Sequence, residues 1–163
     1  MTRNRWLGAA MMGAGALLGA IAGSTWVRRN FVVITVDGMS MSPALYPGQK
    51  VLVRRGVAGV SRGRIVVVAE PDPETGWSGP PPKEVDLAGE GWCIKRVAAV
   101  SGEPFPARLG RHGQVPDGHV IVLGDHPRSR DSVQYGPCPI DRVLGVQVRK
   151  LSTQETPTEV AVV

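Results

Sequence analysis

Ser40 is the first side chain in the sequence whose type and surroundings suggest chemistry. It lies in residues 37–45, a turn-like segment that directly follows an apolar run. A serine hydroxyl becomes an effective nucleophile when a neighbouring base takes its proton. Three histidines could provide that base in a Ser-His-Asp triad, namely His112, His119 and His126. None of them lies in a recognisable triad context, so the sequence leaves room for another base.

Lys95 is the alternative base. It lies in residues 92–100, a run that is apolar except for Lys95 and Arg96. Successive side chains of a strand point to opposite faces, so one of these two must face the interior or a cleft. Burial disfavours the ammonium form of lysine and makes it a usable base near neutral pH, whereas arginine stays charged. The other interpretation is a lysine whose amine extends into solvent, as single lysines in strands often do.

Six apolar, β-branched runs must position these residues and a third polar segment, residues 124–136. Turn-forming residues separate the runs, which cover residues 31–36, 50–53, 65–69, 93–100, 120–123 and 143–148. No helical period of useful length occurs between them. We therefore predict an all-β domain with short connections.

The chain divides into three parts. We predict a membrane anchor with flanking arginines in residues 1–29, a β-rich catalytic domain in residues 30–151 and a disordered polar tail in residues 152–163. Within the domain, residues 70–91 are rich in proline and glycine. This composition predicts a surface excursion outside the core.

The anchor is predicted from residues 6–27, which are 22 positions without a charged side chain. A helix of this length can cross a hydrocarbon core of about 30 Å. Gly15, Gly19 and Gly23 have the small-xxx-small spacing that lets helices associate, so the anchor could support a homo- or hetero-oligomer. A secretory signal cleaved after Ala20-Ile21-Ala22 is the alternative. Both interpretations target the chain to a membrane.

The net charge of +5 could suggest a nucleic-acid partner, but its location argues against one. From Asn30 onward the chain has 15 Lys or Arg and 14 Asp or Glu, so the basic excess flanks the apolar segment. We expect membrane lipid rather than nucleic acid as a partner. Cys93 and Cys138 lack metal-ligand spacing. They could pair as a disulfide or be two small buried side chains, and the sequence leaves both open.

Taken together, the three polar segments resemble those of the type I signal peptidases and the mitochondrial inner-membrane peptidases. The G-x-S-M-x-P box of that family is matched by residues 38–43, and its K-R strand by Lys95-Arg96. Its G-D-N…S-x-D-S-R block is similar to residues 124–132. The resemblance covers about residues 33–148. It implies a small signal-peptidase-like β-barrel or sandwich domain behind one N-terminal transmembrane helix.

The resemblance implies a role for each matched residue. Ser40 would be the acylating nucleophile, with its own backbone N–H as an oxyanion donor, and Lys95 would be the general base. Ser129 would orient the Lys95 amine, and Asp131 would hold the polar turn together. Gly38 occupies the position at which other members place a serine as a second oxyanion donor.

Two positions depart from the family pattern. His126 stands where the family has asparagine. Val133 stands where an arginine would pair with Asp131. Arg128 and Arg130 are the candidates to supply the missing partner. The short span between residues 95 and 124 also implies that the large accessory domain of some bacterial members is absent.

The implied activity is that of a serine endopeptidase of the signal peptidase I type. It would remove signal peptides from exported preproteins that carry small residues at positions −1 and −3, with Met41 lining the substrate cleft. It would need no metal or organic cofactor. We expect a single-pass membrane protein whose catalytic domain lies on the non-cytoplasmic face, in a bacterial plasma membrane in preference to the mitochondrial inner membrane.

Three other functions are compatible with parts of this pattern. A dedicated maturation protease with a single substrate would have the same core. Self-cleaving repressors share the Ser–Lys pair, but the near-neutral body and the apolar start argue against a DNA-binding module. A non-catalytic, membrane-tethered β-barrel binding module would have no special requirement for Ser40 or Lys95.

Overall fold

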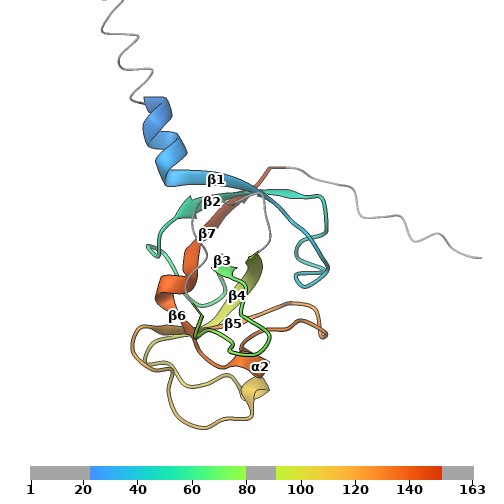
Figure 1. The fold of residues 1–163 in the computed structure, drawn as a ribbon, viewed down its shortest axis with the longest axis vertical. Coiled ribbons are helices and arrows are strands. Elements are labelled where there is room, and N and C mark those ends of the chain that lie inside the picture. Colours follow the sequence, from blue (N-terminus) through green and yellow to red (C-terminus); the bar gives the residue numbers. More distant parts are fainter. Residues whose placement is uncertain (1–22, 80–90, 152–163) are drawn as a thin grey trace, which may run out of the picture.

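The computed structural model describes residues 23–79 and 91–151. Its main element is one antiparallel sheet of seven strands, ordered β1-β2-β7-β3-β4-β5-β6 (Figure 1). The strands are β1 (Phe31–Thr35), β2 (Lys50–Arg55), β3 (Ile65–Ala69), β4 (Trp92–Val100), β5 (His119–Leu123), β6 (Cys138–Pro139) and β7 (Val143–Lys150). The all-β prediction is confirmed at this level. Instead of a closed barrel or a two-sheet sandwich, the described residues form a single curled sheet that resembles half a barrel (Figure 1).

Curling of this sheet accompanies irregularities in the strand pairing. The register shifts between Leu52 and Val53, between Val67 and Val68, and between Val97 and Ala99. Such bulges bend a strand and increase its right-handed twist. In the described part of the chain β1 and β6 each pair with only one neighbour and therefore form the two edges.

All six predicted apolar runs are strands, with ends that differ from the prediction by two residues or fewer. Three kinds of short element in the structure were not predicted from the sequence. Strand β6 has two residues, helix α2 (Ser132–Tyr135) has four, and the 3-10 helices η1 (Ala107–Leu109) and η2 (Ile140–Arg142) have three each. A periodic pattern needs more residues than these elements contain, so their formation depends on contacts from elsewhere in the chain.

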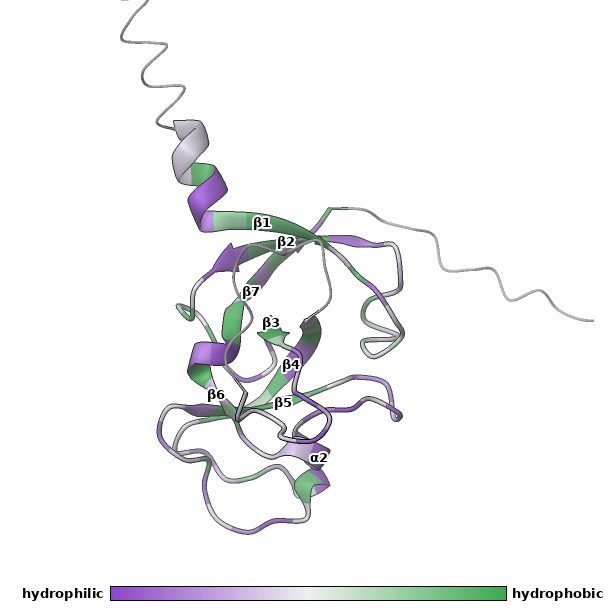
Figure 2. Cartoon of the chain, viewed as in Figure 1, coloured by the Kyte–Doolittle hydropathy of each residue, from purple (hydrophilic) through white to green (hydrophobic). Residues whose placement is uncertain are grey.

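Strand β3 lies at the centre of the core because both of its faces are covered. Val67 belongs to a buried cluster that contains residues of β1, β2 and the segment after β1. Val66 and Val68 belong to a second cluster on the other face, with residues of β4, β5 and β7. Figure 2 shows the corresponding hydrophobic colouring along these strands.

The predicted surface excursion differs from the structure at Trp77. Its side chain is 8% exposed and lies in the second buried cluster. The indole N–H donates to the carbonyl of Gly136 at 3.1 Å, and the ring meets Tyr135 edge-on at 6.3 Å between centroids. The prediction that residues 70–91 lie outside the core is therefore wrong for Trp77. An aromatic ring supplies enough apolar area to fold a glycine- and proline-rich segment back onto the sheet. Residues 80–90 lie outside the described residues.

The N-terminal part of the described chain is helical over residues 23–30 and leads directly into β1 (Figure 1). Within residues 23–79 and 91–151, no helix is long and apolar enough to cross a membrane. The predicted anchor in residues 1–29 falls mostly outside these ranges, as does the predicted tail in residues 152–163. Both therefore remain predictions.

Candidate active site

A groove of about 900 Å³ brings together residues that are far apart in the sequence. One wall is formed by β1 and the segment that follows it, including Gly38 and Ser40. The first half of β4, including Lys95, forms another part of the groove. The turn between β5 and α2, including Ser129, lies at its polar end. Four of the six predicted site residues thus meet in a single cavity.

Lys95 is the buried member of the Lys95–Arg96 pair. Its side chain enters the groove from β4 and is 4% exposed, and its Nζ lies 2.9 Å from the Oγ of Ser129. Among the described residues no carboxylate forms an ion pair with it. Arg96 points away from Lys95, as strand alternation requires, and is held by two hydrogen bonds to Asp125 at 2.7 and 2.8 Å. This pairing raises the pKa of Arg96 and keeps its charge fixed outside the groove.

Ser40 lies in the groove on the segment that follows β1, with its side chain half-buried. Within the described residues its backbone N–H donates to no protein acceptor, so this donor is free to meet a substrate oxygen. Ser40 Oγ and Lys95 Nζ line the same groove but are not hydrogen-bonded to each other. Gly38, two residues earlier, has a φ of 72°, a left-handed value that favours glycine.

Met41 is not in the position that the sequence analysis predicted. The side chain is 1% exposed and packs in the core with Leu45 and Val67 instead of lining the cleft. Met39, which is 51% exposed, lines the groove in its place. The burial of Met41 depends on how the turn after β1 packs against the sheet, which a local sequence pattern does not predict.

Asp131 organises the turn that carries Ser129. Its buried carboxylate accepts hydrogen bonds from the N–H of Gly124 at 2.9 Å and from the N–H of Val133 at 3.0 Å. The second bond caps the N-terminus of α2, and Gln134 completes a capping box by accepting from the Asp131 N–H. The role of Asp131 in holding this turn together stays a prediction, and these hydrogen bonds are the contacts through which it would act.

Gly124 is the point at which the backbone of the turn comes close to both Ser129 and Ser40. A Cβ atom added there would lie 2.0 Å from the Oγ of Ser129 and 2.7 Å from the carbonyl oxygen of Ser40. Only glycine leaves room for this approach. The carbonyl of Ser40 also accepts a hydrogen bond from the backbone N–H of His126 at 3.0 Å. Because that bond uses the backbone of His126, the change from asparagine to histidine leaves it intact.

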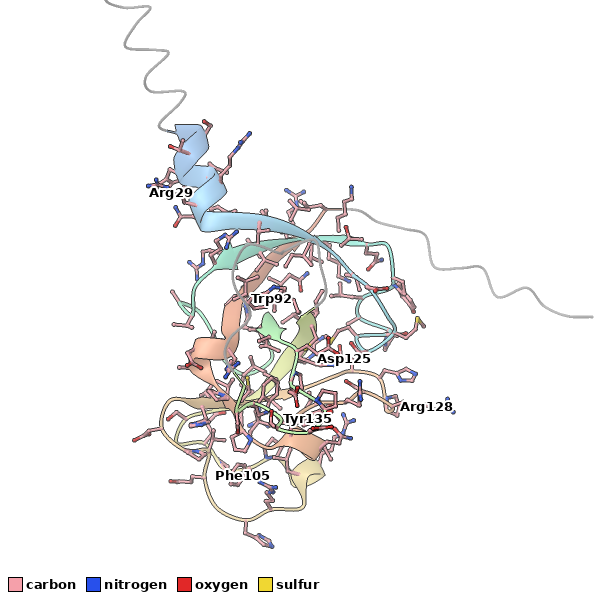
Figure 3. All side chains as sticks on the ribbon, in the orientation of Figure 1. Arg29, Trp92, Phe105, Asp125, Arg128 and Tyr135 are labelled. Atoms are coloured by element: carbon pink, nitrogen blue, oxygen red, sulfur yellow. The ribbon has the colours of Figure 1, made fainter. Side chains whose placement is uncertain are left out.

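The arginine nearest to Asp131 comes from a part of the chain that the sequence analysis did not consider. Arg108, in η1, places its Nη2 4.0 Å from Oδ2 of Asp131. Among the described residues Arg128 and Arg130, the predicted partners, form no ion pair with Asp131 and line the groove instead. Figure 3 shows Arg128 at the outer end of its turn. Nothing local to Arg108 in the sequence indicates its contact with a residue 23 positions away.

The two cysteines are free, so the disulfide alternative does not hold in this structure. Cys93 lines the groove and Cys138 is buried in the second cluster. Burial raises the pKa of the Cys93 thiol to about 12. Burial also raises the pKa of Cys138. Within the described ranges no three His, Cys, Asp or Glu side chains gather closely enough to hold a metal ion.

A serine and a buried lysine that line one groove are the residue types from which a Ser–Lys nucleophilic site can be built. Comparison with known proteins gives the family. Residues 10–105 match the family described as signal peptidase, peptidase S26, and the chain belongs to this family. The match contains Ser40 and Lys95 and ends before the turn that carries Ser129.

Two relatives are similar to the chain over most of its length. The mitochondrial inner membrane protease subunit 2 of Danio rerio is 35% identical over 133 residues, which are 74% of this chain and 64% of that protein. The mitochondrial inner membrane protease subunit 1 of Xenopus tropicalis is 30% identical over 118 residues, or 69% of this chain and 64% of that protein. The chain thus spans just under two thirds of the length of each relative.

Proposed function

We propose that this chain is a serine endopeptidase in which Ser40 is the nucleophile and Lys95 the general base. The observation that carries the proposal is the environment of Lys95. Its amine is buried, has no carboxylate partner among the described residues and lies 2.9 Å from Ser129 Oγ in the groove that Ser40 also lines. A general base must lie within reach of the hydroxyl whose proton it takes, and Lys95 and Ser40 line the same groove.

The proposed reaction proceeds in two steps. Ser40 Oγ attacks the peptide carbonyl while Lys95 takes the hydroxyl proton, and the backbone N–H of Ser40 donates to the developing oxyanion. Lys95 then passes the proton to the leaving amine, and an acyl-enzyme forms on Ser40. In the second step Lys95 activates a water that hydrolyses the ester. The missing Ser40–Lys95 hydrogen bond would form when substrate binds, as catalytic contacts often tighten only in the complex.

We infer that the substrates are preproteins bound in extended form. The groove runs beside β1, which is an edge strand in the described sheet and can pair with an added peptide strand. Apolar side chains of β1 and β4, including Ile34 and Ile94, contribute to its lining and suit small residues at positions −1 and −3 of a signal peptide. A dedicated maturation protease would use the same groove.

We further propose that the enzyme acts at a membrane, with residues 1–29 as a single-pass anchor and residues 30–151 as the catalytic domain on the non-cytoplasmic face. Both relatives are named as membrane protease subunits. They support membrane association and an assembly with a second subunit. They are mitochondrial, so the expectation of a bacterial plasma membrane has no support from them.

The test uses the full chain in detergent micelles with a preprotein substrate. Ser40→Ala and Lys95→Arg should each lower kcat by about 10³-fold or more, because the first removes the nucleophile and the second removes its base, and the two act together. The double variant should be hardly worse than either single one. Ser61→Ala and Lys150→Arg are matched controls, since both side chains are exposed and lie outside the groove.

Two outcomes would contradict the proposal. Substantial cleavage by Lys95→Arg would show that this lysine is not the base, because arginine cannot accept the proton near neutral pH. Loss of activity in His126→Ala equal to that in Lys95→Arg would move the base to a histidine. A non-catalytic binding module predicts that neither Ser40→Ala nor Lys95→Arg changes ligand binding.

A further inference from the structure

Hydrogen bonds hold Gly124 at both its backbone N–H and its backbone carbonyl. Its N–H donates to Oδ2 of Asp131 at 2.9 Å, and its carbonyl accepts a hydrogen bond from Nη1 of Arg108 at 3.2 Å. The other guanidinium nitrogen of Arg108 lies 4.0 Å from the same Oδ2. Arg108 therefore contacts both the carbonyl of Gly124 and the carboxylate that accepts from the Gly124 N–H.

The orientation of Gly124 decides where Ser129 lies. Ser129 Oγ occupies the space next to the Gly124 α-carbon, so closely that a Cβ there would come within 2.0 Å of it. Ser129 Oγ in turn is the hydrogen-bond partner of Lys95 Nζ. A tilt of the Gly124 peptide would move this hydroxyl, and with it the lysine amine, relative to Ser40.

The charge that faces Asp131 comes from outside the turn. Asp131 has a side chain with no exposed surface, and a buried carboxylate without a cationic neighbour is costly. Val133, the position at which the resembling family has an arginine, is apolar and 37% exposed. Arg108 reaches the carboxylate from η1, which packs against α2.

We propose that Arg108 is a positioning residue for the Ser40–Lys95 site. It gives Asp131 the guanidinium partner that the resembling family supplies from the position of Val133. It acts through Gly124 and Asp131 on Ser129, and it touches neither Ser40 nor Lys95. The expected effect of Arg108 on cleavage rests on the proposed function. The expected effect of Arg108 on the turn that carries Ser129 can be measured whether or not the chain cleaves a substrate.

The experiment compares kcat, KM and amide hydrogen exchange in four full-length chains: the parent, Arg108→Gln, Val133→Arg and the double variant. Arg108→Gln should lower kcat about fivefold with little change in KM, the size expected for a partly exposed charge contact. Exchange of the Gly124 N–H should become faster by a similar factor. Val133→Arg in the Arg108→Gln background should recover both quantities, because it returns a guanidinium to Asp131 from the other side.

Arg111→Gln is the matched control, since Arg111 lies in the same loop, is exposed and makes no ion pair within the described residues. It should leave both quantities unchanged. Parental kcat and parental Gly124 exchange in Arg108→Gln would overturn the proposal, and so would a failure of the double variant to recover. If the parent itself does not cleave preproteins, the proposed function fails, and the exchange measurement still decides the role of Arg108.

Discussion

Two turns carry the residues that face each other across the groove, and they are held in different ways. The turn with Ser40 is anchored by apolar burial, because Met41 and Leu45 are 1% and 0% exposed in the core. The turn with Ser129 is anchored by polar contacts to Asp131, Arg96 and Arg108. Apolar burial holds a backbone segment firmly with little dependence on geometry, whereas hydrogen bonds fix the direction of a side chain. We infer that the nucleophile needs a rigid platform and that the lysine needs an oriented partner.

The largest expected effect on stability comes from the apolar anchor. Leu45→Ala should lower the free energy of unfolding by about 3 kcal/mol, because it leaves a cavity in the first buried cluster. Leu45→Met is the control, since it keeps most of the volume and should cost clearly less. Urea unfolding at low and high salt measures both. A salt-sensitive loss in Leu45→Ala would contradict the assignment of this turn to apolar burial.

Gly124→Ala should lower the free energy of unfolding by less than Leu45→Ala does, but it should lower the cleavage activity by more. The added methyl would overlap Ser129 Oγ and approach the Ser40 carbonyl, so the two turns must separate. We expect a loss of about 1–3 kcal/mol from overpacking, together with near-complete loss of cleavage. Gly79→Ala is the control, because no atom of the described residues lies within 4 Å of its added Cβ. Parental cleavage by Gly124→Ala would show that the close approach is dispensable.

Asp131→Ala tests the polar anchor directly. It removes the N-cap of α2 and the acceptor of the Gly124 N–H, and should lower the free energy of unfolding by about 1–2 kcal/mol. Asp141→Ala, at an exposed carboxylate, should change it by less than about 0.5 kcal/mol. Thermal unfolding of the two variants measures the difference. Equal effects would mean that the buried carboxylate contributes no more than a surface one.

The smallest effect concerns the groove wall next to Lys95. Cys93 precedes Lys95 by two residues on the same face of β4, and burial raises the pKa of its thiol to about 12. In a Cys138→Ala chain, whose only thiol is Cys93, alkylation at pH 8 should be roughly a hundredfold slower than in the urea-unfolded chain. The rate should rise with pH. The stability that this neutral thiol contributes is present below pH 9 and is lost as the pH rises towards 12. Rapid alkylation at pH 8 would show that solvent reaches the Cys93 thiol in this wall of the groove.

The sequence by itself determined the strands and the candidate residues. Alternating or continuous β-branched runs are local patterns, so all six long strands could be predicted to within two residues at each end. The order of the polar segments identified Ser40, Lys95, Ser129 and Asp131 before any contact was known. Strand alternation also required Lys95 and Arg96 to face opposite ways.

Only the tertiary structure decided which of these two faces the groove. That choice depends on the segment after β1 and the turn after β5 meeting one face of β4, an arrangement between elements that are remote in sequence. The same holds for Met41, which a tight turn sends into the core, and for Trp77, which folds back onto the sheet. Arg108 reaches Asp131 across 23 positions because η1 packs against α2. Local patterns encode which face of an element is apolar, whereas the partner of a charge depends on which elements the folded chain brings together.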